Sequence, residues 1–252
     1  MADAARAPIR SSAFPASSPI PRHTALVRIT HWVTVLSFFA LLVTGFEIVL
    51  SHPRFYWGET GNILTPPLFV LPIPSSRASV ITGYRYVLPD QNGWSRYLHF
   101  QAAWLVVLTG LLYVVSGLVT RHFKNDLLPA KADLSWRSLA AAIGSRLRFE
   151  PPDESKDWSY NALQRLTYIF VIFGLFPLVV WTGLAMSPAF VSAFPATVTL
   201  LGGQQSARTL HFLVSLALLL FLVVHVAMIW LAGFKNRMRA MITGRAASPE
   251  DR

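Results

Sequence analysis

Four long stretches of this chain are apolar almost without interruption, and more polar segments separate them. They cover approximately residues 26–50, 97–119, 163–186 and 210–232. A helix needs about 20 mostly apolar residues to cross the hydrocarbon core of a bilayer. The pattern therefore predicts an all-α integral membrane protein, a bundle of four transmembrane helices. Pro177 lies inside the third stretch and is expected to kink that helix.

Composition agrees with a membrane protein. Hydrophobic residues make up 53% of the 252 residues and charged residues only 13%, about half the charged share of a soluble domain. The chain has no cysteine, which excludes disulfides, thiolate-held iron–sulfur clusters and haem attached through C-x-x-C-H. A redox cofactor would therefore need non-sulfur ligands, or methionine at most.

The distribution of Lys and Arg predicts the direction of the helices. The two tails and the 120–165 connection carry 17 of these residues, against 5 in the 51–96 and 187–209 connections. Cytoplasmic loops are enriched in Lys and Arg, so we expect both termini to be cytoplasmic. The net charge of +10 has the same origin, because the basic residues lie at segment ends and form no patch typical of nucleic-acid binding.

The remaining segments complete the predicted domain organisation. Residues 1–24 are interpreted as a disordered cytoplasmic tail, residues 25–240 as the membrane domain and residues 241–252 as a second cytoplasmic tail. The proline-rich 51–96 connection is expected to form an ordered periplasmic cap, which either packs on the bundle or docks a partner. Apolar residues at helical spacing predict that residues 135–148 form a helix on the membrane surface.

Four histidines lie inside the apolar stretches: His31, His99, His211 and His225. The last two are 14 residues apart, about four helical turns, so they share one helix face about 21 Å apart along the axis. With the expected helix directions, His31 and His225 lie toward the cytoplasmic face, and His99 and His211 toward the outer face. Depth therefore groups the four histidines into two pairs.

Each pair is suited to binding one haem b, because haem iron accepts two axial imidazoles. A histidine in a membrane helix can instead form a hydrogen bond across the bundle or carry protons. The grouping of all four by depth favours two bis-histidine haem b sites. Three further histidines, His23, His52 and His122, lie outside the spans and are interpreted as surface residues. His122 has the basic neighbours Arg121 and Lys124 and could also line a quinone pocket.

Arginines recur at a fixed distance before three of the ligands. Arg28, Arg96 and Arg208 each precede a histidine by three residues, so each shares a helix face with it and is a candidate for binding a haem propionate. Ordinary positive flanking of a span explains Arg28 equally well. It explains Arg96 and Arg208 less well, because they oppose the charge bias.

Glycines lie on the same helix faces as the histidines. Gly45 follows His31 by 14 residues, and Gly110 and Gly117 follow His99 by 11 and 18, which are close to whole numbers of turns. These glycines would leave room beside the backbone for the edge of a flat macrocycle. Close packing of helices explains them as well.

At these residues the chain resembles the bacterial di-haem cytochrome b family. This family includes b561-type cytochromes and the membrane subunits of formate dehydrogenase, Ni,Fe-hydrogenase and thiosulfate reductase. The resemblance covers approximately residues 22–240, and it is carried by Arg-Ile-Thr-His31-Trp, Tyr-Leu-His99-Phe and the pair His211 and His225. It implies a bundle in the bacterial inner membrane that passes electrons between quinone, its substrate, and a periplasmic redox subunit.

The resemblance also implies where quinone and partner bind. The quinone site would adjoin the pair His31–His225. The long outer loop, with Trp57-Gly58-Glu59-Thr60-Gly61-Asn62, looks like that of family members that accompany a molybdopterin oxidoreductase of the sulfite oxidase type. The chain would then be the electron-transfer subunit of an oxidoreductase complex.

Two other functions are less compatible with the sequence. A stand-alone quinone-linked oxidoreductase could act on a diffusible molecule such as superoxide, but such a substrate needs no long docking loop. A histidine-based proton channel or transporter is disfavoured by the small number of spans and by the lack of Asp within them; Glu47 lies near the outer end of the first span.

Overall fold

The computed structural model describes four segments of the chain and four single residues: 24–62, 64–72, 91–121, 162–244, Phe123, Leu128, Ala140 and Gly144. Several predicted features lie outside the described residues. They are residues 1–23 of the N-terminal tail, which include His23, the 135–148 surface helix except Ala140 and Gly144, and His122. Residues 73–90 of the predicted cap and the end of the chain from residue 245 also lie outside them.

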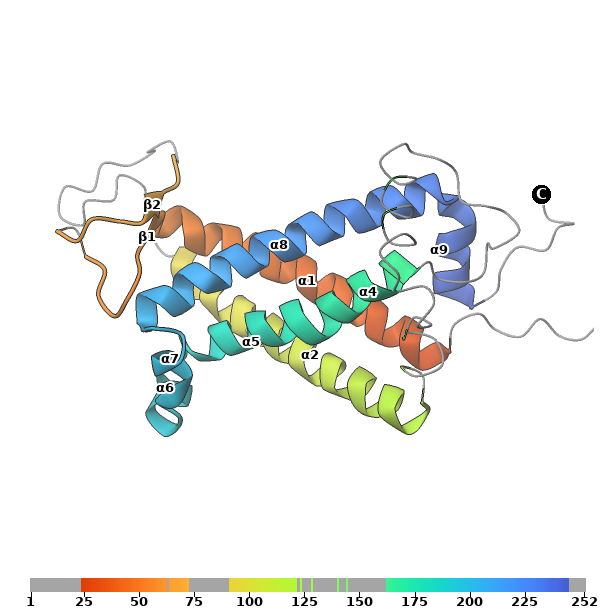
Figure 1. Ribbon diagram of the computed structural model, residues 1–252, viewed down its shortest axis with the longest axis horizontal. Coiled ribbons are helices and arrows are strands. Elements are labelled where there is room, and N and C mark those ends of the chain that lie inside the picture. Colours follow the sequence, from red (N-terminus) through yellow and green to blue (C-terminus); the bar gives the residue numbers. More distant parts are fainter. Residues whose placement is uncertain are drawn as a thin grey trace, which may run out of the picture.

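Four long helical segments cross one another along the length of the molecule (Figure 1). They are α1 (Ala25–Ser51), α2 (Gln91–Val119), the run from α4 to α5, and α8 (Gln204–Leu231). Helix α1 packs along α2, and α5 packs along α8. Each segment is long and apolar enough to span a membrane, which confirms the predicted all-α fold with four spans.

The third span is interrupted by a π-helical turn. It consists of α4 (Ala162–Phe170), the π-helix η4 (Val171–Leu175) and α5 (Phe176–Leu184). Pro177 has no N–H to donate to the preceding turn. A wider turn directly before it is one way for a helix to continue past a proline, and this is where the sequence predicts an irregularity.

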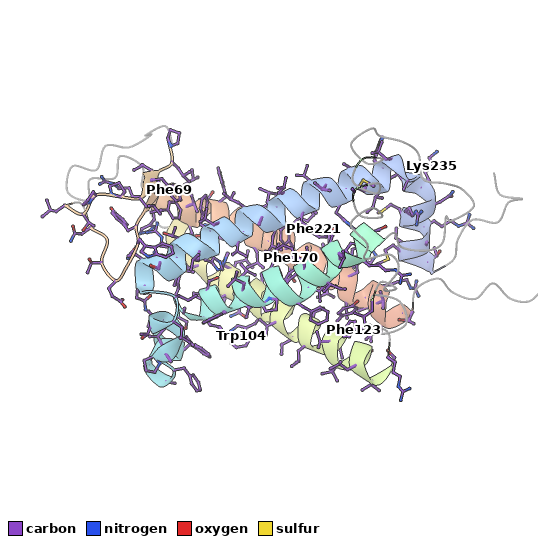
Figure 2. All side chains as sticks on the ribbon, viewed as in Figure 1. Phe69, Trp104, Phe123, Phe170, Phe221 and Lys235 are labelled. Carbon is purple, nitrogen blue, oxygen red and sulfur yellow. The ribbon has the colours of Figure 1, made fainter. Side chains whose placement is uncertain are left out.

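Large apolar side chains cover the outside of the bundle (Figure 2). Trp104 of α2 and Phe170 of α4 are both more than half exposed. Fully buried side chains are instead often small and polar, including Thr44, Thr182 and Ser206. Such a distribution suits a protein whose surroundings are lipid tails, where apolar surface needs no burial and helices approach through small residues.

A small cap closes one end of the bundle. Strands β1 (Arg54–Phe55) and β2 (Phe69–Val70) form an antiparallel sheet, and the short helices α6 (Pro188–Ala193) and α7 (Ala196–Thr199) lie at the same end (Figure 1). The loop after β1 meets the start of α8, where the Gly58 carbonyl accepts the N–H groups of Gln205 at 2.9 Å and Ser206 at 3.3 Å. The described part of the 51–96 connection thus packs on the bundle.

Helix α9 (Phe234–Thr243) lies at the opposite end, after a turn at Gly233. Gly233 has φ 90°, a left-handed conformation that glycine adopts without steric cost. The turn lets α9 fold across the beginning of α1 (Figure 1). The Trp32 indole N–H donates to the Met241 carbonyl at 3.2 Å, which fastens the two helices together.

Candidate cofactor site: two histidine pairs

The four histidines of the spans lie in two facing pairs. His99 on α2 faces His211 on α8, with ring centroids 6.3 Å apart. His31 on α1 faces His225 on α8, with ring centroids 6.4 Å apart. We call these the loop-end pair and the α9-end pair, after the elements at each end. The groupings match the depths expected from helix direction, whereas haem binding itself stays a prediction.

The spacing within each pair fits two imidazoles on opposite sides of one metal ion. A metal–imidazole bond is about 2 Å long and the nitrogen lies roughly 1.15 Å from the ring centre, so the centroids should be about 6.3 Å apart. The observed separations are 6.3 and 6.4 Å. The interplanar angles of 64° and 57° are compatible, because rotation about the axis through the metal changes the angle and leaves the distance unchanged.

Hydrogen bonds fix the tautomer of His211. Its Nδ1 lies 3.1 Å from the Val179 carbonyl oxygen and 3.0 Å from Thr182 Oγ1. A carbonyl oxygen only accepts hydrogen bonds, so Nδ1 carries the proton. The lone pair is then on Nε2, which is the nitrogen available to a metal.

The same logic applies to His99. Its Nδ1 lies 2.9 Å from Thr44 Oγ1. The Thr44 hydroxyl donates to the Ala40 carbonyl at 2.7 Å, so its oxygen accepts from the imidazole. Both ligands of the loop-end pair therefore have Nδ1 protonated and Nε2 available for coordination.

A glycine follows each of these threonines and lies against the imidazole edge. A Cβ on Gly45 would lie 3.5 Å from Cε1 of His99, and one on Gly183 would lie 3.3 Å from Cε1 of His211. Gly45 is among the glycines predicted from the sequence, whereas Gly183 and both threonines were not predicted.

Aromatic side chains surround the α9-end pair. The His225 ring stacks on Phe221 with centroids 5.5 Å apart and an interplanar angle of 28°, and it meets Tyr168 of α4 edge-on at 6.4 Å. The Tyr168 hydroxyl accepts a hydrogen bond from Gln164 Nε2 at 2.8 Å. Neither Tyr168 nor Gln164 was predicted, because their relation to His225 depends on how α4 meets α8.

Glycines further along α2 have different surroundings. A Cβ on Gly117 would collide with the ring of Phe123, whereas no atom outside its own helix lies within 4 Å of such a position on Gly110. Close packing was the alternative explanation for these glycines, and Gly117 shows that packing. The space beside it is filled by a side chain of the protein.

Arg208 and Arg96, the arginines expected near the loop-end pair, differ in their contacts. Arg208 donates to the His52 carbonyl, and its guanidinium lies 5.1 Å from the centre of the Phe55 ring. Arg96 is exposed near the start of α2. A guanidinium has several N–H donors, so the bond to His52 is compatible with the predicted propionate contact, which stays a prediction for both arginines.

His52 was interpreted as a surface residue, and in the structure it is partly buried at the end of α1. Burial lowers the pKa of its imidazole below 6.5, and the positive charges of Arg208 and Arg96 lower it further. His52 is therefore neutral at neutral pH. The sequence holds no clear signal for this position, because the arginines lie far from it along the chain.

Arg28 is bound at the other end of the molecule. Its Nη1 donates to the Ile242 carbonyl of α9 at 2.6 Å. Cations are favoured at the C-terminal end of a helix, where carbonyl groups lack partners. This contact is compatible with both explanations of Arg28, and its role toward a propionate stays a prediction.

Among the described residues, no metal site has more protein ligands than the two imidazoles of each histidine pair. No three His, Asp or Glu side chains gather within the described part of the chain. A pair of imidazoles suits a metal whose other ligands come from elsewhere, as haem iron takes four from its porphyrin.

Comparison with known proteins identifies the family. A family model described as prokaryotic cytochrome b561 matches residues 22–244. The chain is 30% identical over 222 residues to "Putative protein-methionine-sulfoxide reductase subunit YedZ1" of Azospira oryzae, covering 88% of this chain and 96% of that protein. It is 25% identical over 213 residues to "Probable Ni/Fe-hydrogenase B-type cytochrome subunit" of Cupriavidus necator, covering 81% of this chain and 76% of that protein.

No solved structure matches the chain. The family match spans most of the sequence, and the four apolar helices agree with it. Membership implies haem b as the cofactor and electron transfer as the role. The chain thus belongs to the prokaryotic cytochrome b561 family and is a multi-pass membrane electron-transfer subunit of that type.

Proposed function

We propose that the chain holds two haems b and passes electrons between membrane quinone and a periplasmic redox partner. The observation that carries this proposal is the spacing of the two histidine pairs, 6.3 and 6.4 Å between ring centroids. A haem bound by two imidazoles supplies one-electron transfer and has no open position for oxygen. The protein's part is to hold the imidazoles in place.

Helix α8 supplies one ligand to each site. His211 and His225 lie 14 residues apart on it, about 21 Å along the helix axis. One rigid element therefore sets the distance between the two sites. This arrangement supports electron transfer from one membrane face to the other.

We further propose that the loop-end pair faces the periplasm of a bacterial inner membrane and that both termini are cytoplasmic. The excess of Lys and Arg in the tails and the 120–165 connection supports this orientation. The quinone site then adjoins the α9-end pair. Tyr168 and Gln164 support this placement, because their hydrogen-bonded side chains put polar groups beside His225 that suit a quinone carbonyl.

The partner in this proposal is a separate oxidoreductase subunit. The names of both relatives describe subunits, one of a reductase and one of a hydrogenase. Apolar side chains exposed on the cap, Trp57, Leu64 and Leu68, offer a surface for docking at the loop end. We propose a molybdopterin enzyme as this partner, from the resemblance of the long loop.

The test is the haem content of single-ligand variants. His99→Ala and His31→Ala should each bind one haem b per chain, because each removes a ligand from a different site. The matched control is His52→Ala, which removes a histidine that belongs to neither pair and should keep two haems. Loss of both haems in either ligand variant, in protein that remains folded by circular dichroism, would contradict two independent sites.

A further inference from the structure

We infer that Thr44 and Thr182 are positioning residues for the loop-end haem: they orient its two histidine ligands and lower its midpoint potential. The inference rests on the proposed binding of haem by His99 and His211. It adds two residues, on two different helices, that set the electronic properties of that one site.

The two threonines stand in equivalent positions relative to their histidines. Thr44 lies on α1, which packs along the helix that carries His99, and Thr182 lies on α5, which packs along the helix that carries His211. Their Oγ1 atoms lie 2.9 and 3.0 Å from Nδ1 of the respective imidazole. Both threonines are fully buried, so water cannot replace either contact.

Each hydroxyl is committed as a donor within its own helix. Thr44 donates to the Ala40 carbonyl at 2.7 Å, and Thr182 donates to the Leu178 carbonyl at 2.8 Å. A hydroxyl has one hydrogen, so only its lone pairs remain for the imidazole. Each threonine therefore accepts from Nδ1–H, although at His211 it shares that hydrogen with the Val179 carbonyl. These acceptors hold the tautomer that leaves Nε2 for the iron.

This hydrogen bond has an electronic consequence. A ligating imidazole that donates its second N–H becomes more basic. A more basic ligand stabilises the ferric form more than the ferrous form, which lowers the midpoint potential. Since both ligands of the loop-end pair make the bond, the two effects act on the same iron.

The experiment is a potentiometric titration of full-length protein with Thr44→Val and Thr182→Val. Valine keeps the shape of threonine and removes the acceptor oxygen. Thr44→Val should shift the ratio of oxidised to reduced loop-end haem about three- to tenfold toward the reduced form, a tenfold shift being about 59 mV for one electron. Thr182→Val should shift it in the same direction but less, because the Val179 carbonyl still accepts from His211 Nδ1–H. The loop-end transition is identified as the one missing in His99→Ala, and the other transition should not move.

Two further variants separate the hydroxyl from packing. Thr44→Ser and Thr182→Ser keep the acceptor and should restore the wild-type midpoint. Thr30→Val is the matched control, because Thr30 is buried on α1 and its hydroxyl bonds to the Leu26 and Val27 carbonyls in the same way. Thr30→Val should leave the loop-end midpoint unchanged.

The midpoint potentials and haem contents of these variants decide whether the inference holds. An unchanged loop-end midpoint in both valine variants overturns the inference, as does an equal shift in Thr30→Val or a failure of serine to restore the wild-type value. Loss of the loop-end haem in a valine variant and its retention in the serine variant supports the inference. Wild-type protein that binds no haem overturns the proposed function instead, so the two failures are distinguishable.

Discussion

His211 is the ligand that its neighbours constrain most closely at the scale of single residues. Its Nδ1 meets both the Val179 carbonyl and Thr182, and Gly183 lies against the edge of the same ring. The ring is therefore held from two sides. A methyl group added at Gly183 should therefore displace the imidazole of His211 directly.

We expect Gly183→Ala to perturb the loop-end site more than Gly45→Ala. The new methyl group would lie 3.3 Å from Cε1 of His211 at position 183, but 3.5 Å from Cε1 of His99 at position 45. The first distance is shorter than an ordinary contact between carbon atoms, which is about 3.5–4.0 Å. Haem content and the low-spin ferric electron paramagnetic resonance spectrum report the change, and an equal or larger effect of Gly45→Ala would contradict the prediction.

His52 should make stability depend on pH. Its pKa in the folded protein is below 6.5 because of burial and the charges of Arg208 and Arg96. Below about pH 6.5 the unfolded chain therefore takes up a proton more readily than the folded protein, and the free energy of unfolding decreases. The contribution of His52 to the free energy of unfolding is fully present above about pH 6.5 and is lost as the pH falls through the lower pKa of the folded protein.

The measurement is thermal unfolding in detergent, compared between about pH 7 and about pH 5. Wild-type protein should lose more in Tm over this interval than His52→Gln, which has no titrating group at this position. An identical loss in both proteins would show that His52 does not contribute.

The sequence could predict the histidines but not the residues that orient them. The interval between His211 and His225 is a strong signal because a helix repeats regularly. The Thr-Gly pair is a weak signal, since it occurs six times in the chain. Only the packing of α1 on α2 and of α5 on α8 distinguishes the pairs at 44–45 and 182–183 from the rest.

At the scale of elements, hydrogen bonds connect the cap to the first turns of α8. The Ser206 hydroxyl accepts the Gly58 N–H at 2.8 Å, and the Thr209 hydroxyl donates to the Tyr56 carbonyl at 2.6 Å. These contacts join positions about 150 residues apart. The first turns of α8 are thereby tied to the loop above the site of His211.

Ser206→Ala should loosen the cap and leave the haem sites in place. The change leaves the Gly58 N–H without its side-chain acceptor, which typically costs about 1–3 kcal/mol. Limited proteolysis should cleave the 52–72 segment faster in the variant than in the wild type, with two haems retained in both. Equal cleavage rates would mean that this contact does not hold the cap.

Hydropathy predicted the four spans because bilayer thickness sets their length. It did not predict where α2 and α8 begin, since their first turns at Gln91 and Gln204 are polar and lie before the apolar stretches. The sequence predicted an irregularity at Pro177 and an ordered cap in the 51–96 connection, but not the π-helical form of the first or the paired strands of the second. The pairing of β1 with β2 depends on contacts between separate parts of that connection.

At the scale of the whole molecule, the two proposed cofactor sites lie toward opposite ends of one bundle. The loop-end pair lies below the cap, and the α9-end pair lies at the end where the Arg28 guanidinium and the Trp32 indole bind α9. Exposed apolar side chains lie on the cap at one end, and the hydrogen-bonded Gln164 and Tyr168 lie beside the histidines at the other. This difference between the ends agrees with the proposed transfer of electrons between quinone and a second protein.

The ratio of haem to polypeptide in purified full-length protein tests the central claim most directly. The pyridine haemochrome assay, with protein quantified by amino-acid analysis, should give two haems b per chain, and the reduced spectrum should be that of six-coordinate haem. A ratio of one or less, after expression with ample haem, would contradict the assignment of both histidine pairs as cofactor sites.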